Sequence, residues 1–130
     1  MKRALVERGR RFLMIALFTG ASTIASHGAF AADTASAVAS GKWLFQKHCS
    51  ICHKSDGSGG VTLGNAISAD LRAPALEHMY HDSDARLRRA ILDGKNKDGE
   101  PLEQIMPRWR GQLTGREVTS IIAFLKTLHP

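Results

Sequence analysis

The chain has 130 residues, which is enough for one domain. Its formal net charge is +6, but the first 32 residues hold five of the 18 basic side chains and one of the 12 acidic ones. The remaining 98 residues therefore carry a net charge of only +2, which argues against a nucleic-acid-binding protein.

The N-terminal segment has the three parts of a secretory signal peptide. Basic side chains gather between Lys2 and Arg11, a mostly apolar stretch runs from Phe12 to Ile24, and Ala29-Phe30-Ala31 matches a small-x-small cleavage site. We therefore predict that the protein is exported to the periplasm.

This interpretation divides the chain into a signal peptide, residues 1–32, and one domain, residues 33–130. The alternative is an uncleaved membrane anchor, because no charged residue occurs from 12 to 32. Ser, Thr and Gly make the second half of that stretch only weakly apolar, so it would insert poorly. We expect no membrane contact unless the signal is retained as an anchor.

Residues 35–48 are predicted to form a helix. Val38, Gly41 and Leu44 recur at helical spacing, and Phe45 lies on the same side. A glycine inside a helix costs roughly 1 kcal/mol relative to alanine. We therefore expect another helix to pass so close to Gly41 that a side chain would not fit.

The next five residues, Cys49-Ser50-Ile51-Cys52-His53, contain both cysteines of the chain. Cys-x-x-Cys-His is the attachment sequence of a c-type haem. Two thiols on one helical turn can add to the two vinyl groups of a haem, and the histidine that follows can bind the iron. We predict one haem c, attached covalently through Cys49 and Cys52, with His53 as an iron ligand.

Two other chemistries use the same cysteine spacing. A thioredoxin-like redox pair would need a strand–helix–strand pattern around it, and none is evident. A zinc site needs four ligands, whereas Cys49, Cys52 and His53 supply three and the chain has no second cysteine pair. Haem attachment is the better interpretation.

Residues 54–64 are rich in glycine and are predicted to form a loop, followed by a short helical turn at 65–71. Pro74 then lies in an apolar setting. We expect it to mark the place where a backbone carbonyl accepts the second ring N–H of His53, since a metal-bound histidine usually donates to such an acceptor. The alternative is an ordinary loop proline.

Two more helices are predicted. One starts at Asp82 or Ser83 and stops before Gly94, and its run of Arg86, Arg88 and Arg89 is interpreted as a solvated face without function. After a long loop, Thr114 to Glu117 forms a capping box that opens the last helix. The buried stripe of that helix is Val118, Ile121, Ile122, Leu125 and Leu128.

The chain contains no internal repeat and no run that favours a strand, so the predicted class is all-α, with three principal helices. From residue 33 onward it resembles a bacterial class I c-type cytochrome. The residues that carry the resemblance are Gly41-x-x-x-Phe45-x-x-x-Cys49-x-x-Cys52-His53, Pro74-x-Leu76, Met106-Pro107 and the 121–125 segment Ile-Ile-Ala-Phe-Leu.

The resemblance implies a class I cytochrome c fold in which three principal helices surround one covalently bound haem. It implies that His53 is the proximal ligand, supported by Pro74, and that Met106 is the distal ligand. The first and last helices would cross near a right angle. Trp109 and Tyr80 are only candidates for holding the haem propionates.

The distal ligand has several rivals, and methionine is usually core filler. Met106 stands out because it ends a loop, is followed by Pro107 and precedes a well-capped helix. The other candidates are Met79, His48, His78, His81 and His129.

His/Met coordination fills all six iron positions, so we predict one-electron transfer rather than catalysis. The expected partners are redox proteins, an electron donor and an acceptor, in an exported electron-transport chain. The alternatives are a haem c subunit of a periplasmic oxidoreductase or oxidase complex, and a five-coordinate haem enzyme or gas sensor. Basic side chains near the ligands could steer an acidic partner: Lys47, Lys54, Arg108 and Arg110.

Overall fold

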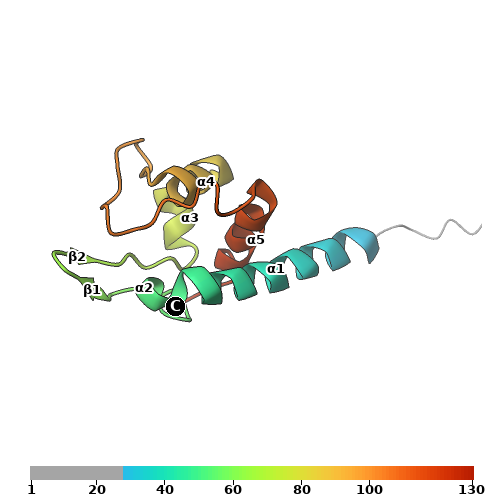
Figure 1. Cartoon of the computed structure of the whole chain (residues 1–130). Coiled ribbons are helices and arrows are strands. Elements are labelled where there is room, and N and C mark those ends of the chain that lie inside the picture. The colour runs from blue at the N-terminus through green and yellow to red at the C-terminus, as the bar shows by residue number, and fades with distance from the viewer. Residues whose placement is uncertain (1–27) are drawn as a thin grey trace, which may run out of the picture.

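The structure, a computed structural model, describes residues 28–130. It is mainly helical, as predicted, with one small hairpin (Figure 1). Its helices are α1 (Gly28–His48), α2 (Ser50–His53), α3 (Ala75–Met79), α4 (Asp84–Asp93) and α5 (Gly115–Leu125), and its strands are β1 (Thr62–Leu63) and β2 (Ala66–Ile67).

Most of the predicted signal peptide, residues 1–27, lies outside the described residues. The predicted cleavage site falls in the first turn of α1, and nothing in the fold tests whether it is cut. Among the helices of residues 28–130, none has the length and apolar character needed to span a bilayer.

The core forms where α1 meets α5, and Gly41 lies at the point of contact. A Cβ atom added to Gly41 would fall 1.8 Å from the carbonyl oxygen of Ser120, so the two backbones touch without space for a side chain. One turn further on, the rings of Phe45 and Phe124 pack with centroids 5.4 Å apart. The predicted close approach at Gly41 is confirmed.

Both predicted ends of α4 and the predicted start of α5 are confirmed, whereas α1 begins at Gly28 rather than at residue 35 and α5 ends at Leu125, before Leu128. The hydroxyl of Ser83 accepts a hydrogen bond from the Arg86 N–H at the start of α4, and Gly94 ends α4 in the left-handed conformation with φ 62°. At α5, Thr114 and Glu117 form the reciprocal capping box.

The prediction of a helical turn at residues 65–71 is wrong, because a hairpin occupies residues 62–67. Thr62 pairs with Ile67 and Leu63 pairs with Ala66 in antiparallel register, and Gly64 and Asn65 make the turn. Gly64 has φ 63°, which glycine adopts without strain. Two-residue strands are too short to leave an alternating pattern in the sequence.

The arginine-rich face of α4 is not simply solvated, contrary to the prediction. The Arg88 guanidinium donates to the carbonyl oxygen of Gly115 and to the hydroxyl of Thr119, both at 2.7 Å, and so ties α4 to the first turns of α5. Arg89 donates to two carbonyls of the 94–101 loop, those of Asn96 and Lys97. These arginines therefore position the elements next to α4.

Candidate functional site

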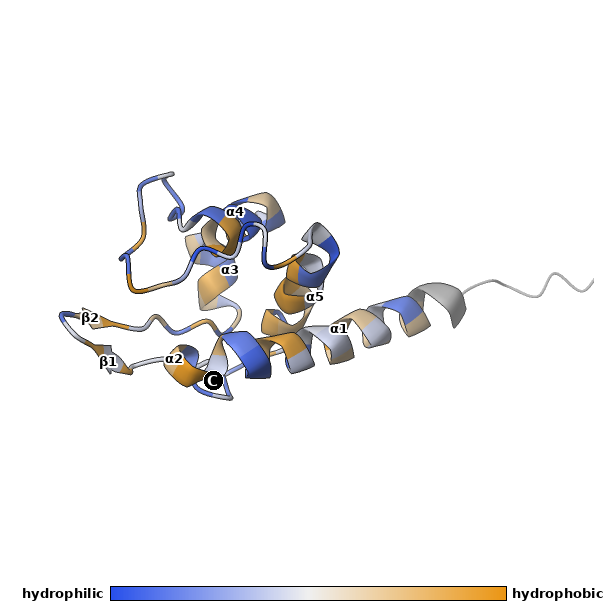
Figure 2. Cartoon of the chain, viewed as in Figure 1, coloured by the Kyte–Doolittle hydropathy of each residue, from blue (hydrophilic) through white to orange (hydrophobic). Residues whose placement is uncertain are grey.

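Residues of α2, of the hairpin and of the loop that follows α4 line a largely apolar cavity of about 410 Å³. This volume falls within the range of about 300–1,000 Å³ typical of cofactor and ligand sites. In Figure 1 the loop that follows α4 lies above α2 and the hairpin. Figure 2 shows hydrophobic residues in α2, β1 and β2. The lining residues are His48, Cys49, Ile51, Cys52, His53, Leu63, Ala66, Ile67, Ser68, Ala69, Leu102, Glu103, Ile105, Met106, Pro107 and Trp109.

One helical turn brings the two thiols and the imidazole to this cavity. The Cys49 N–H donates to the Phe45 carbonyl at 2.8 Å, which continues the backbone pattern of α1. The N–H groups of Cys52 and His53 then both donate to the Cys49 carbonyl, at 3.1 and 3.0 Å. Because Phe45 is fully buried against α5, the motif is fixed to the core through the end of α1.

His53 has a backbone partner, but it is not near Pro74. Its Nδ1 lies 2.9 Å from the carbonyl oxygen of Ala69, so a proton on Nδ1 leaves Nε2 as the nitrogen free to bind a metal. The Pro74 carbonyl instead accepts from the His78 N–H at 3.0 Å, and Pro74 is exposed and does not line the cavity. The carbonyl that accepts from His53 was predicted near Pro74, but it belongs to Ala69, five residues earlier, so this prediction is wrong.

The glycines of the 54–64 loop explain how Ala69 reaches His53. The Gly60 N–H donates to the Ser68 carbonyl at 2.9 Å, and Gly59 packs so tightly that a Cβ atom there would lie 2.2 Å from the Ala69 oxygen. A side chain at position 59 would displace the acceptor. Because the acceptor is a backbone carbonyl, the residue type at position 69 gave no signal in the sequence.

The two thiols lie in a nonpolar setting. Burial, reinforced by the neighbouring Cys52, raises the pKa of Cys49 to about 11. Cys49 is therefore a neutral thiol near pH 7 and can line an apolar cavity without the cost of a buried charge.

Met106 reaches the cavity from a separate segment, residues 102–109. Backbone hydrogen bonds fix both ends of this segment to the C-terminal end of α4. The Leu102 N–H donates to the carbonyl oxygen of Gly94 at 2.7 Å, and the Trp109 N–H donates to the carbonyl oxygen of Ile91 at 3.3 Å. Between these anchors, the Met106 N–H closes a local turn onto the Glu103 carbonyl at 3.1 Å.

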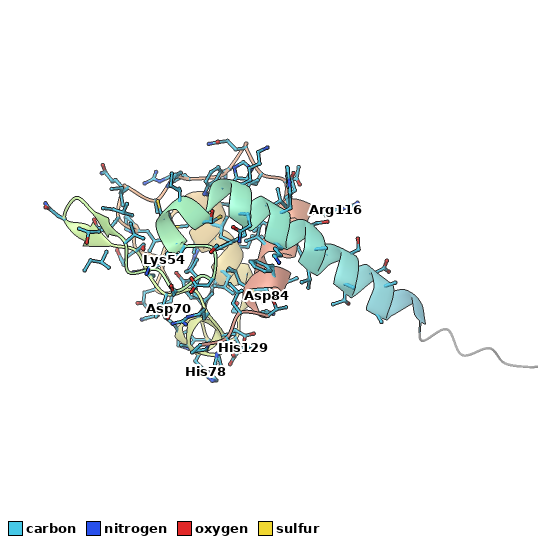
Figure 3. All side chains as sticks on the ribbon, turned by 90° about the horizontal axis from the view of Figure 1, so that it is seen from below. Lys54, Asp70, His78, Asp84, Arg116 and His129 are labelled. Atoms are coloured by element: carbon cyan, nitrogen blue, oxygen red, sulfur yellow. The ribbon has the colours of Figure 1, made fainter. Side chains whose placement is uncertain are left out.

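Met106 lines the cavity, whereas most of the other candidates for the distal ligand do not. Met79, His78, His81 and His129 do not line it, and Figure 3 shows His78 and His129 at an edge of the molecule. His48 does line it, with its ring 5.0 Å from that of Trp109 in an edge-on contact.

Of the two candidates for holding propionates, only Trp109 belongs to the cavity. Trp109 is half-buried in its wall, whereas Tyr80 is buried in the core and does not line the cavity. The position of Trp109 is compatible with contact to a bound group.

The basic residues expected to ring the site are not gathered at the cavity. None of Lys47, Lys54, Arg108 and Arg110 lines it. The Lys47 ammonium lies 4.8 Å from the centre of the Trp43 ring, and Arg110 is paired with Asp93. Three of the exposed side chains that line the cavity are large and apolar, Ile51 at 85%, Ile67 at 72% and Ile105 at 48% exposure, and the exposed Glu103 lies among them.

The donor set of this cavity fits a haem better than a bare metal ion. Among residues 28–130, no group of three or more His, Cys, Asp or Glu side chains is arranged to hold an ion. Two thiols and an imidazole on one turn, facing an apolar cavity that a thioether also lines, are the groups a covalently attached haem requires.

The comparison with protein families agrees with this geometry. Residues 36–125 match the family described as cytochrome C oxidase, cbb3-type, subunit III. No curated protein and no solved structure gives a significant match. Since the match spans more than two thirds of the chain and includes the haem-attachment motif and Met106, the protein belongs to this family and carries a c-type cytochrome domain.

Proposed function

We propose that the protein transfers single electrons through one haem c, with Cys49 and Cys52 as the covalent attachments and His53 and Met106 as the axial ligands. The observation that carries this proposal is that the motif on α2 and the thioether of a separate loop line one apolar cavity. The family, a cytochrome c subunit of an oxidase, supports the haem and the electron transfer.

Each residue has a distinct task in this proposal. The two cysteines tether the group, so that it cannot be lost from an open site. The Ala69 carbonyl fixes the orientation of the His53 ring through Nδ1 and raises its basicity as a ligand. When bound, the haem supplies reversible one-electron exchange at its iron. The apolar lining excludes water and lowers the local dielectric constant.

Met106 is favoured over His48 as the distal ligand. His48 lies at the end of α1, one residue before the attached Cys49, and its ring packs against Trp109. Met106 comes from the loop that the sequence places before the last helix, and Pro107 beside it restricts the backbone. A thioether ligand raises the reduction potential relative to a second histidine. With both axial positions filled, a five-coordinate enzyme or sensor is not favoured.

The most specific setting for this activity is a haem subunit of an oxidase complex in the periplasm, with no catalytic role of its own. The family description favours it, and so does the apolar rim, Ile51, Ile67 and Ile105, because exposed isoleucines around a cofactor cavity suit contact with another protein. An independent, diffusing electron carrier is the alternative. Copurification of the haem protein with an oxidase distinguishes the two.

Export is part of the proposal. A signal peptide covering residues 1–32 would leave a mature chain that starts at Asp33. Mass spectrometry of the protein recovered from the periplasm tests this start point. A full-length haem protein in the membrane fraction would instead support a retained anchor.

Replacing Met106 tests the ligand assignment directly. We expect Met106→Ala to abolish the methionine–Fe(III) charge-transfer band of the oxidised protein. It should also lower the reduction potential by on the order of 0.1 V, within the range of about 0.8 V over which axial ligands set haem potentials. The matched control is Met79→Leu, because Met79 is 51% exposed and lies outside the cavity. An intact band in Met106→Ala would refute the assignment.

A further inference from the structure

The C-terminal end of α4 carries a charge that the helix itself disfavours. Asp93 is the last residue of α4, where the helix dipole places partial negative charge and a carboxylate is destabilising. The guanidinium group of Arg110, 17 residues later in the chain, offsets this unfavourable charge. The Arg110 Nη2 donates to Asp93 Oδ2 at 2.8 Å, and its Nε donates to Oδ1, which makes a two-pronged pair.

Arg110 directly follows the segment that carries Met106, residues 102–109, and is itself bonded to α4. Its own N–H donates to the Leu92 carbonyl at 3.1 Å, next to the Trp109 contact with Ile91. The other end of the segment is fixed by Leu102 on Gly94. Both ends of residues 102–109 therefore rest on the last turn of α4, while Glu103, Gln104 and Ile105 between them are exposed.

The two ends of the segment are held by different sets of bonds. The bond at the Leu102 end is 2.7 Å long, whereas the two backbone bonds at the far end are 3.3 and 3.1 Å long. At the far end a charged side-chain pair is added, and charge-assisted bonds are stronger than neutral ones. The Asp93–Arg110 pair therefore adds a charge-assisted contact at the end of the segment that follows Met106.

We propose that Asp93 and Arg110 are positioning residues that fix the Met106 segment on α4 and so keep its thioether in the cavity. The inference rests on the proposed function, in which Met106 is an iron ligand. The pair is partly exposed, with side chains 29% and 66% accessible, so its contribution to global stability is small. Its effect is on the local equilibrium between bound and released methionine.

The test is competition by free imidazole in the oxidised holoprotein, followed by loss of the methionine–Fe(III) band. We expect Asp93→Asn and Arg110→Gln each to bind imidazole roughly twofold to fivefold more tightly than the wild type, the range that one partly exposed charged pair supports. The double variant should bind no more tightly than either single variant, because both remove one interaction. Amide exchange at Trp109 and Arg110 should accelerate in Asp93→Asn.

The matched control is Lys126→Gln. It removes another exposed ion pair of α4, Lys126 with Asp84 at 2.6 Å, that does not touch the loop. Its imidazole affinity should equal that of the wild type, and unfolding by denaturant should show similar stability in all variants.

The outcomes separate the two proposals. A wild-type band with unchanged imidazole affinity in both single variants overturns the positioning role alone, as would additive effects in the double variant. A wild type without the band overturns Met106 ligation and the positioning role with it.

Discussion

The two walls of the cavity are built in different ways. On the His53 wall, two thiols and an imidazole lie within five residues, and their backbone bonds continue from α1. On the Met106 wall, one thioether lies on a loop that is bonded to the C-terminal end of α4 and to Gly94 directly after it. The first wall is specified by local sequence, whereas the second depends on contacts between distant segments. The Met106 wall should therefore be the more easily disturbed of the two.

The largest effect is expected from a change at the contact between α1 and α5. It should disturb both walls of the cavity, because α1 leads into the His53 wall and the Met106 wall is followed by α5. Gly41→Ala places a Cβ atom 1.8 Å from the Ser120 oxygen. We expect a net loss of roughly 2–3 kcal/mol in the free energy of unfolding, despite the gain of about 1 kcal/mol that alanine brings to a helix. Denaturant unfolding measures it. Ser40→Ala, at an exposed position of the same helix, should cost little, and an equally small cost for Gly41→Ala would contradict the tight contact.

The next largest effect is expected from a substitution that disturbs only the His53 wall. Gly59→Ala brings a Cβ atom 2.2 Å from the Ala69 oxygen, so the acceptor of the His53 ring must move. We expect a cost of roughly 1–3 kcal/mol and a higher reduction potential, because an imidazole that loses its acceptor is a weaker donor to ferric iron. The methionine–Fe(III) band should remain.

The control for this variant is Gly64→Ala. Gly64 has nearly the same backbone conformation, φ 63° against 61°, but a Cβ atom there meets nothing within 4 Å. It therefore carries the backbone strain without the clash. Equal potentials for the two variants would show that displacement of Ala69 does not affect His53.

The smallest expected effect is a pH dependence confined to the His53 wall. Asp70 follows Ala69, and hydrogen bonds from the Arg72 guanidinium lower the pKa of its carboxyl group to about 2. The folded-state pKa lies below the unfolded value of about 3.9, so the pair stabilises the fold above about pH 4 and this contribution disappears as the pH falls toward 2. Asp70→Asn should flatten the stability profile in that window, measured by denaturant unfolding. An unchanged profile in Asp70→Asn would contradict this contribution.

The sequence was most informative where one short segment carries the whole signal. The cysteine–histidine motif, the capping box and the glycine of the helix contact each depend on residue type at fixed spacing, and the structure bears out the capping box and the close approach at Gly41. By contrast, the acceptor for His53 is a backbone carbonyl, which any residue can provide. Pro74 follows the haem motif in the order that the family shows, but it did not indicate where the acceptor for His53 lies.

Charged side chains were hard to interpret for a related reason. Arg88 is bonded to α5, 27 and 31 residues away, and Arg110 is bonded to Asp93, 17 residues away. Spacing along one helix indicates which residues share a face, but not which element lies across from that face. In the sequence Arg88 was interpreted as part of a solvated face and Arg110 as a residue that could steer an acidic partner, although each is bonded to another element of the fold.

The three exposed isoleucines at the cavity mouth have a consequence for association. A partner that covers Ile51, Ile67 and Ile105 removes hydrocarbon surface from water. Such a complex should form with a negative heat-capacity change and tighten on modest warming. Its dissociation constant should vary little between low and physiological ionic strength, unlike that of a complex held by lysine and arginine side chains.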